Sequence, residues 1–436
     1  MRFITRLIEK DIRRIHGHPR GRILAVTGAR QCGKTTLATL TFPEYPVISL
    51  DSPIERAVYE KMRPADWIAQ YPRAIIDEAQ KHPAVFETIK ACYDRNPHVR
   101  YLLLGSSQIL LLKNIRETLA GRVSLRELYP FSLPELVTAF GGPPPERSRL
   151  IELICAPDPG TTMASLFPPT IPLEDDDGAS RRAWEYLLHW GGMPAILGPQ
   201  WDDQDRFEWL ADYFDTYLQR DLADLARLDR LEPFVRAQKA AALKTAQTVN
   251  FSELARLAEV SPPTARQFMR YLEVSFQIVL VPAWFRNREK RLVKQPKLHF
   301  LDPGVRRAVL KRRGEVDGAE FESAVVAEIW KQSRTARLPI ELHHLRTADG
   351  REVDLLLERQ DGFIAIECKQ TTRATPADSR HLTKLEGILD KPLLLALVVS
   401  NDIRPRSLHP GPPSIWTVAA HQLLGRGHEP KHRNPG

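Results

Sequence analysis

A phosphate-binding pattern lies close to the N-terminus of the chain. It fits GxxxxGK[ST] and consists of Gly28, Ala29, Arg30, Gln31, Cys32, Gly33, Lys34 and Thr35, with Thr36 directly after it. The apolar run ILAVT precedes the pattern and the helix-favouring run TTLATLTF follows it. A glycine-rich turn between a strand and a helix wraps its amides around phosphates. The sequence therefore predicts an ATP site in which Lys34 contacts phosphate and Thr35 holds Mg²⁺.

A pair of carboxylates follows the phosphate-binding pattern downstream. Residues 74–76 are predicted to form a short buried strand that ends in Asp77 and Glu78. Carboxylates in this position hold Mg²⁺ through water and polarise the attacking water. We therefore assign Asp77 to the metal and Glu78 to the general base. The alternative is an ordinary acidic helix start, which the upstream loop disfavours.

The first block of the sequence alternates short β-rich runs with helical stretches. This alternation predicts an α/β fold with a parallel sheet of the P-loop NTPase type, with strands at 21–27, 46–50, 74–76, 101–105 and 123–128. Ser106 and Ser107 follow the fourth strand, where they either sense the γ-phosphate or form a plain turn. Arg122 precedes the fifth strand. There it either acts as an arginine finger on a neighbouring copy in a homo-oligomer or forms a surface ion pair.

Length and composition limit the class of protein. The chain has 436 residues, which is more than one compact hydrophobic core usually contains, so about two to four domains are expected. No apolar run approaches the roughly 20 residues that cross a bilayer, and no membrane partner is expected. Cysteines without metal or CxxC spacing predict reduced thiols in a cytoplasmic protein: Cys32, Cys92, Cys155 and Cys368.

Shifts in composition divide the chain into five parts. Residues 1–140 form the ATPase block, and 141–181, rich in proline and glycine with an acidic run at 174–177, are expected to be a mobile linker or insertion. Residues 182–313 are mainly helical, and 314–425 return to mixed strand and helix. The polar tail 426–436 is expected to be disordered.

A winged helix-turn-helix pattern lies within the helical part. Ser252 caps one predicted helix, and prolines at 262 and 263 begin the next. In a DNA-binding version the second helix faces the duplex through Thr264, Arg266, Gln267 and Arg270. The wing contacts phosphates through Arg286, Arg288, Lys290 and Arg291. Residues 281–313 hold eleven Lys or Arg, and the whole chain carries a net charge of +8, which favours a polyanion such as DNA. A lid or protein-contact role, with a solvated basic face, is the alternative.

A second set of chemical residues lies in the last block. Asp354 stands on one predicted strand, thirteen positions before Glu367 on the next, and Lys369 shares a strand face with Glu367. This D…ExK set resembles the PD-(D/E)xK nuclease superfamily. The predicted order also matches: helix 321–332, strands, helix 379–389, strand 393–400. The resemblance implies a restriction-endonuclease-like domain in which Glu322, Asp354 and Glu367 hold Mg²⁺ and Lys369 orients the water. A retained but inactive platform, or plain exposed strand charges, are the alternatives.

Motifs along nearly the whole chain resemble one group of bacterial and archaeal AAA-type ATPases. They are GARQCGKTTLA, AIIDEAQ, LLLGSSQ, LAGRV, ELYPFSLPEL, GGMPA, YLQRDLADL and KLHFLDPGVRRAVL. The resemblance implies an AAA+-like ATPase domain followed by a C-terminal region of unknown function. Residues Tyr217, Arg220 and Asp221 match the group without any derivable chemistry.

Two functions from different classes follow from these motifs. The first is a DNA-associated ATPase whose hydrolysis of ATP drives the winged helix and the nuclease-like domain. The second is an ATP-dependent switch or scaffold whose C-terminal domain is a non-cleaving interaction module.

Overall fold

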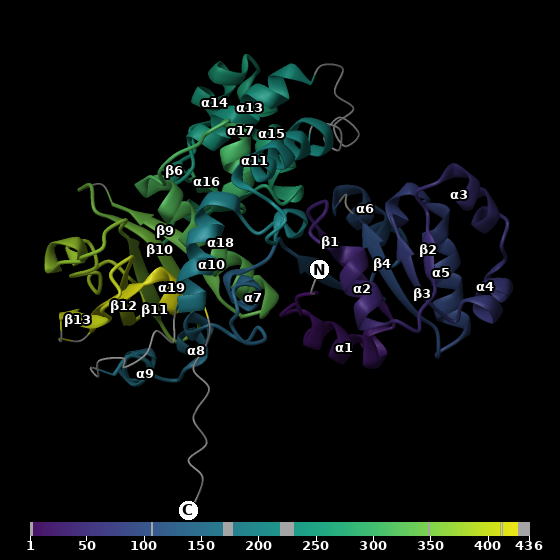
Figure 1. The fold of residues 1–436 in the computed structure, drawn as a ribbon, viewed down its shortest axis with the longest axis horizontal. Helices are drawn as coiled ribbons and strands as arrows, with labels where there is room; N and C mark the ends of the chain where they lie inside the picture. Colours follow the sequence, from purple (N-terminus) through teal and green to yellow (C-terminus); the bar gives the residue numbers. More distant parts are fainter. Residues whose placement is uncertain are drawn as a thin grey trace, which may run out of the picture.

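The computed structural model describes residues 3–105, 108–168, 178–218, 231–347, 349–409, 411 and 413–425. Figure 1 shows two sheets, one at each side of the molecule, with helices between and above them. The expectations for Ser106, Ser107, Arg220, Asp221 and the tail fall outside the described residues. So does the side chain of Tyr217.

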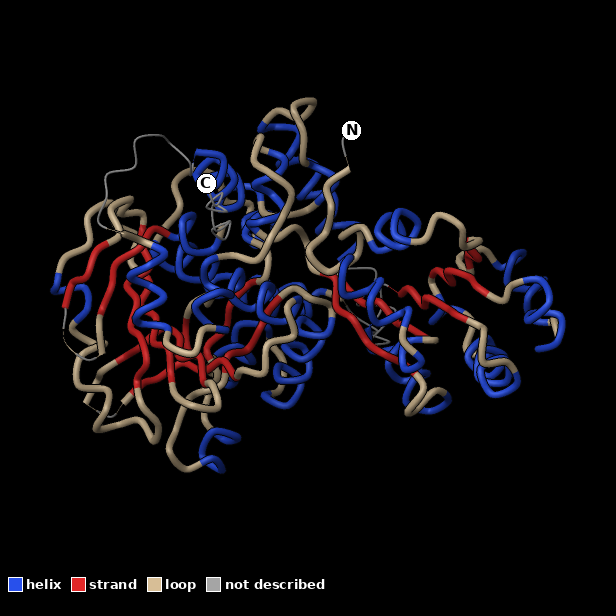
Figure 2. Tube along the Cα trace, turned by 90° about the horizontal axis from the view of Figure 1, so that it is seen from below, coloured by secondary structure: helices blue, strands red, loops and turns tan. Residues whose placement is uncertain are grey.

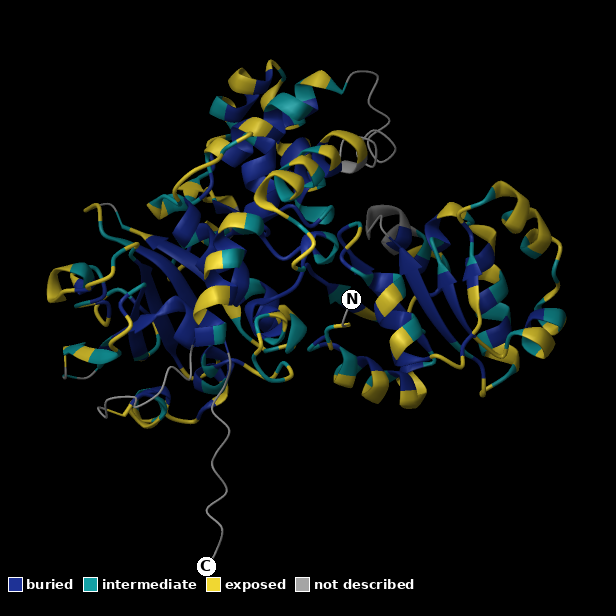
Figure 3. Ribbon diagram, viewed as in Figure 1, coloured by how far each residue is buried: buried dark blue, intermediate teal, exposed yellow. Residues whose placement is uncertain are grey.

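The first sheet confirms the predicted parallel α/β arrangement. Its strand order is β2-β3-β4-β1-β5, and every neighbouring pair is parallel. The strands are β1 (Ile23–Gly28), β2 (Val47–Ser49), β3 (Arg73–Asp77), β4 (Arg100–Gly105) and β5 (Val123–Leu128). The surrounding helices are α1 (Glu9–Gly17), α2 (Lys34–Thr41), α3 (Pro53–Glu60), α4 (Pro64–Gln70), α5 (Ala84–Arg95) and α6 (Gln108–Thr118). Because β1, β3 and β4 are covered on both faces, their central residues are apolar and buried, and the strands appear dark in Figure 3.

The described parts of the expected linker or insertion, residues 141–168 and 178–181, are largely helical. They contain α8 (Arg149–Cys155), α9 (Pro159–Leu166) and the start of α10 (Gly178–Trp190), while the acidic run at 174–177 lies outside the described residues. Leu150, Leu153 and Met163 are fully buried in the core that also contains the last sheet. These apolar side chains hold the described helices against the domain, so they do not behave as a mobile linker.

The boundary expected at residue 140 is also displaced. Helix α7 (Leu133–Ala139) packs against α10, and its first residue is hydrogen-bonded to α18 (Gly318–Thr335), away from the first sheet (Figure 1). Glu328 accepts a hydrogen bond from the Leu133 amide at 2.8 Å, and Lys331 donates to the Phe131 carbonyl at 3.3 Å. One hydrophobic core therefore runs from the P-loop side of the first sheet into the C-terminal domain.

The helical middle region builds a small domain of its own. Its helices are α11 (Asp203–Asp212), a π-helical turn η4 (Tyr213–Leu218), α13 (Glu232–Leu243), α14 (Phe251–Ala258), α15 (Pro262–Val274), α16 (Arg288–Val293) and α17 (Pro303–Val309). A three-stranded sheet has the order β6-β8-β7, from β6 (Gln247–Thr248), β7 (Ile278–Val281) and β8 (Lys297–Phe300). Asn250 and Ser261 cap α14 and α15 through their side chains.

The C-terminal domain is a mixed six-stranded sheet with the order β13-β14-β12-β11-β10-β9. Its elements are β9 (Glu341–Arg346), β10 (Glu352–Glu358), β11 (Phe363–Cys368), β12 (Leu393–Ser400), β13 (Arg406–His409), β14 (Ile415–Ala419) and α19 (Ala420–Leu424). The predicted helix at 379–389 is wrong. Only a 3₁₀ turn at Pro376–Ser379 forms there, and Lys384 has a φ of 60°, which is incompatible with a helix. Figure 2 shows the two large sheets held apart by helices.

Candidate functional site

The phosphate-binding loop joins the end of β1 to the start of α2. Gly33 takes the N-cap position of α2 with a φ of 93°, a conformation that favours glycine. Gln31, which is not a glycine, also has a positive φ of 57°. The loop therefore bends sharply, and the N-terminus of α2 points toward the space that the loop encloses. An anion-binding site requires this arrangement.

Lys34, Thr35 and Asp77 meet at this loop, as the sequence predicts. The Lys34 ammonium donates to the carbonyls of Gly28 and Ala29, at 3.1 and 2.9 Å. The Thr35 hydroxyl donates to the Asp77 carboxylate at 2.8 Å. A hydroxyl and a carboxylate at this separation fit the oxygen-rich shell that Mg²⁺ prefers. The residues therefore fit a Mg²⁺–nucleotide complex.

Glu78 follows Asp77 in an unusual backbone conformation. Its φ is 52°, and its amide donates to the Asp77 carboxylate at 3.0 Å. The side-chain amide of Gln80 donates a hydrogen bond to the Glu78 carboxylate. Sequence reasoning missed Gln80, although its place two residues after the acidic pair is a usable signal. Strained backbone of this kind costs about 1–3 kcal/mol and is concentrated at functional sites.

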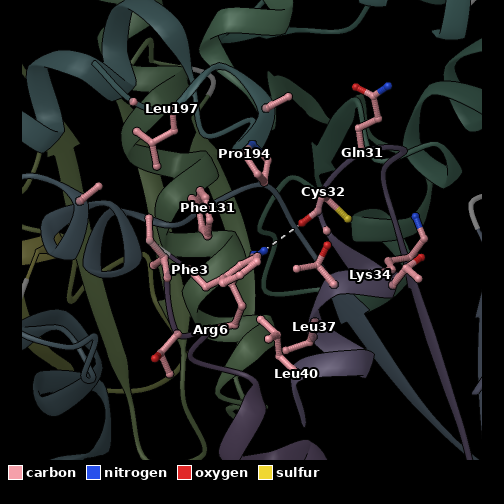
Figure 4. A pocket seen from close by; sticks show the side chains of 18 of the residues that line it. Phe3, Arg6, Gln31, Cys32, Lys34, Leu37, Leu40, Phe131, Pro194 and Leu197 are labelled. Atoms are coloured by element: carbon pink, nitrogen blue, oxygen red, sulfur yellow. Dashed lines mark hydrogen bonds between the residues drawn. The ribbon is translucent and has the colours of Figure 1, made fainter. Parts of the chain in front are cut away.

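A cavity of about 1090 Å³ opens beside the loop. Figure 4 shows it between the P-loop, the N-terminal segment and a loop after α10. Its apolar lining residues include Phe3, Leu40, Phe131, Pro194 and Leu197. Sequence reasoning missed all of them, because they come from four separate segments that only the tertiary fold brings together. An apolar wall next to a phosphate site can hold a nucleotide base.

Arg6 ties the phosphate-binding loop to its surroundings, and its role was also missed. Its guanidinium donates to the carbonyls of Cys32 at 2.9 Å and Tyr129 at 2.6 Å, and to the Glu135 carboxylate at 3.0 Å. It also lies 4.5 Å from the centre of the Phe131 ring. Because Arg6 and Glu135 are both buried, this ion pair is shielded from water.

Arg122 and the phosphate-binding loop lie at opposite ends of the strands of the first sheet. Arg122 immediately precedes β5, whose Val123 pairs with Ile23 at the start of β1, whereas the loop follows the end of β1. The Arg122 side chain forms a two-pronged contact with Asp94, at 2.9 and 3.2 Å. Arg122 therefore cannot reach the nucleotide site of its own chain.

The C-terminal set comes together around strands β10 and β11. The antiparallel register pairs Leu355 with Ile366, so Asp354 and Glu367 are the next opposed residues. Asp354 accepts the Cys368 amide at 2.9 Å, and Lys369 donates to Glu367 at 2.8 Å. Burial, followed by the charge of Asp354, raises the pKa of Glu367 to about 7.

A lysine from the neighbouring domain fills the centre of this acidic set. The Lys297 ammonium, on β8, lies 2.6 Å from Glu322, 2.9 Å from Asp354 and 3.0 Å from Glu352. Burial, followed by Asp354, raises the pKa of Glu322 to about 8. Burial tends to lower the pKa of Lys297, but the negative charges of Asp354 and Glu322 outweigh the effect of burial, so the pKa of Lys297 is raised. As arranged, the carboxylates predicted to hold Mg²⁺ bind an ammonium, so they do not fit a metal ion.

Some basic residues of 281–313 are paired within the molecule, whereas others of the expected phosphate-binding set, including Arg286, are exposed. Arg291 pairs with Glu358 at 2.7 Å, and Arg306 pairs with Glu320 at 2.8 Å. Arg286 donates to the Leu389 carbonyl at 3.0 Å. Exposed positions on this segment include Arg288 and Lys290. On α15 the side chains of Arg266, Gln267 and Arg270 are exposed.

His343 and His344 on β9 are buried. His343 Nε2 lies 3.3 Å from Glu341 and 3.4 Å from Glu358, which groups three potential metal ligands. Glu358 is already paired with Arg291 and with Lys391, at 2.7 and 2.8 Å. These cations oppose a metal ion at this cluster.

Comparison with known proteins identifies the domains. Residues 20–137 match an AAA domain family, and two domains of unknown function, DUF8612 and DUF4143, match 181–315 and 317–408. Uncharacterized proteins of Mycobacterium bovis and Mycobacterium tuberculosis are each 27% identical over 426 residues, covering 95% of this chain and 83% of theirs.

Two solved structures resemble the chain distantly. A Walker-type ATPase of Pyrococcus abyssi has a TM-score of 0.42 and 14% identity, covering 70% of this chain and 94% of its own. The ORC2 protein of Aeropyrum pernix has a TM-score of 0.34 and 15% identity, covering 70% and 92%. Within the described residues no helix is long and apolar enough to cross a membrane. By the family matches, residues 20–137 form an AAA domain, which the P-loop geometry supports, and domains of unknown function follow it.

Proposed function

We propose that this chain is an ATP-hydrolysing switch. The observation that carries the proposal is the 2.8 Å contact between Thr35 and Asp77, beside Lys34 and Glu78. Bound Mg²⁺ would neutralise phosphate charge. The roles of the side chains follow from their positions: Lys34 binds the β- and γ-phosphate oxygens, Thr35 and Asp77 hold the metal, and Glu78 takes the proton of the attacking water.

The part of the switch that responds to ATP is the interface of the P-loop with the other domains. Tyr213, in the π-helical turn of the helical region, donates to the Arg30 carbonyl at 3.1 Å. Arg6 bonds to the Cys32 carbonyl on the same loop. A change in loop conformation on ATP binding would therefore be transmitted to the helical region.

The free thiols of Cys32, Cys92, Cys155 and Cys368 support a cytoplasmic location.

Substitution of Lys34 tests the proposal. Lys34→Ala removes the phosphate ligand, and we expect Mg²⁺-dependent ATP turnover to fall at least a hundredfold, about 3 kcal/mol of transition-state stabilisation. Lys61→Ala, at an exposed position on the same domain, is the matched control. Normal turnover by Lys34→Ala would refute the proposal.

A second candidate function is contact with DNA. The element order α13, β6, α14, α15, β7, β8 supports a winged helix-turn-helix interpretation, and Arg266 and Arg270 are exposed on its second helix. We expect Arg266→Ala/Arg270→Ala to weaken duplex binding and to reduce its salt slope by about two. The charge-matched Arg14→Ala/Arg63→Ala should leave both unchanged.

Arg122 supports assembly of several copies. Because Arg122 lies across the sheet from its own loop, an arginine-finger role requires a neighbouring chain. Arg122→Ala and Lys34→Ala should each be inactive alone, and a mixture should regain part of the ATP turnover. Full ATP turnover by Arg122→Ala alone would contradict the finger role and leave Arg122 as a surface ion pair.

A further inference from the structure

We propose that Lys297 is the resident cation of the acidic set Glu322, Glu352 and Asp354 on α18 and β10, and that it makes the C-terminal domain independent of divalent metal. The proposal goes beyond ATP hydrolysis. It rests on the proposed function only in treating the C-terminal domain as the non-cleaving partner of the switch.

The geometry of Lys297 is that of a bound cation. Its ammonium lies within 3.0 Å of a carboxylate oxygen from each of Glu322, Glu352 and Asp354. These carboxylates come from α18 and β10, whereas Lys297 comes from β8 of the helical region. The Lys297 side chain is only 2% exposed, so water cannot replace the carboxylates. A metal ion and this ammonium cannot share the same oxygen atoms.

Two lysines partner the carboxylates of this region without a metal. Lys297 lies within 3.0 Å of Glu322, Glu352 and Asp354, and Lys369 donates to Glu367 at 2.8 Å. Because the carboxylates of Glu322, Asp354 and Glu367 are largely buried, these ion pairs avoid the large cost of an unpaired buried ion.

Lys297 is fixed in place and cannot act as a removable lid. β8 is the central strand of its sheet, and Lys297 pairs with Thr248 on one side and Val281 on the other. Three residues further on, the Phe300 amide donates to the Ser323 hydroxyl on α18 at 3.1 Å. Withdrawal of Lys297 would therefore break both strand pairings and the contact with α18.

The lysine also joins two domains. The chain just after β7 reaches the edge strand β9, where the Trp284 amide donates to the His344 carbonyl at 2.7 Å and the His344 amide donates to the Pro282 carbonyl at 3.0 Å. Together with the Arg291–Glu358 ion pair, these contacts join the helical region to the C-terminal sheet. The acidic set thus works as an anchor for the helical region.

Binding of Mn²⁺ to the full chain tests the proposal. Titration is followed by electron paramagnetic resonance without nucleotide, so that a failure of ATP hydrolysis would not affect the result. Wild-type protein and Asp354→Asn should bind Mn²⁺ equally weakly, because Lys297 already occupies the set. Tighter binding by the wild type, abolished in Asp354→Asn, would overturn the proposal.

A second variant tests the same point from the other side. Lys297→Met removes the ammonium, keeps the length of the side chain, and leaves the carboxylates unpaired. We expect this variant to unfold at lower temperature and to regain about 5 °C in Tm with excess Mn²⁺, whereas Lys297→Met/Asp354→Asn regains none. A Lys297→Met chain as stable as wild type without metal would overturn the proposal. If Lys297→Met does not fold, the comparison of the wild type with Asp354→Asn decides.

Discussion

The Tyr213 hydroxyl donates a hydrogen bond to the Arg30 carbonyl at 3.1 Å, across 183 positions of sequence. This contact joins a π-helical turn of the helical region to the phosphate-binding loop. π-helical turns are rare and often lie at functional sites, since their extra residue costs stability. The contact gives the loop a support that belongs to another domain.

Loss of this hydroxyl should weaken nucleotide binding. Tyr213→Phe keeps the ring but removes the donor to the Arg30 carbonyl, and one neutral hydrogen bond contributes about 1 kcal/mol. We expect ATP to bind about fivefold more weakly in equilibrium fluorescence titrations. Tyr271→Phe, which removes a hydroxyl elsewhere in the helical region, should bind ATP normally. Equal affinities for both variants would show that the contact does not support the loop.

Substitution of the general base should separate hydrolysis from binding. Glu78→Gln keeps the size of the side chain but cannot take a proton, and general-base catalysis contributes about 10²–10⁴-fold. We expect phosphate release to slow by at least about a hundredfold while ATP affinity is retained. Glu87→Gln, exposed on α5, is the control. Full activity of Glu78→Gln would assign the base elsewhere.

The buried ion pair beside the loop should be important for stability. Arg6 and Glu135 have side chains only 8% and 4% exposed, and the removal of one partner strands a buried charge. We expect Arg6→Met to cost about 3–5 kcal/mol, measured as a lower Tm. Arg6→Met/Glu135→Gln should recover part of this loss, because it removes the stranded charge. A double variant less stable than the sum of the two single changes would contradict this explanation.

Stability should fall in mild acid because of a buried histidine. Burial is the main cause that lowers the pKa of His16 to about 4, and its Nδ1 contacts the Gly21 carbonyl at 2.8 Å. In the unfolded chain the pKa is about 6.5, so below that pH protons bind preferentially to the unfolded chain. The contribution of His16, about 3 kcal/mol, is complete above pH 6.5 and is lost as the pH falls toward 4.

A variant at this position separates His16 from other acid-sensitive groups. His16→Asn can still donate to the Gly21 carbonyl but does not titrate, so its Tm should depend less on pH between 6.5 and 4. The exposed His98→Gln should keep the pH profile of the wild type. An unchanged profile in His16→Asn would mean that other groups cause the loss, such as His344, whose pKa burial also lowers to about 4.

Several elements were predictable because local sequence carries their physical cause. The glycine-rich turn, the apolar strands around it and the Asp77–Glu78 pair need only short-range rules, and the first sheet matches them. The period of the last block likewise predicted β12 at its observed bounds, Leu393–Ser400. The helix expected at 379–389 does not form, although the composition of this stretch favours one. Lys384 adopts a left-handed backbone conformation, which a helix cannot contain.

The sequence by itself determined the nucleotide-binding loop and the parallel sheet that carries it, because both arise from residues close together in the chain. Only the tertiary structure decided what surrounds them. Gly192 illustrates the difference: a Cβ there would lie 2.3 Å from the Phe131 carbonyl, a contact that no local pattern reveals. Arg6 beside the loop and Lys297 among the carboxylates are further cases. Their partners are distant in sequence, and the free energy of a buried charge depends on which groups folding brings beside it.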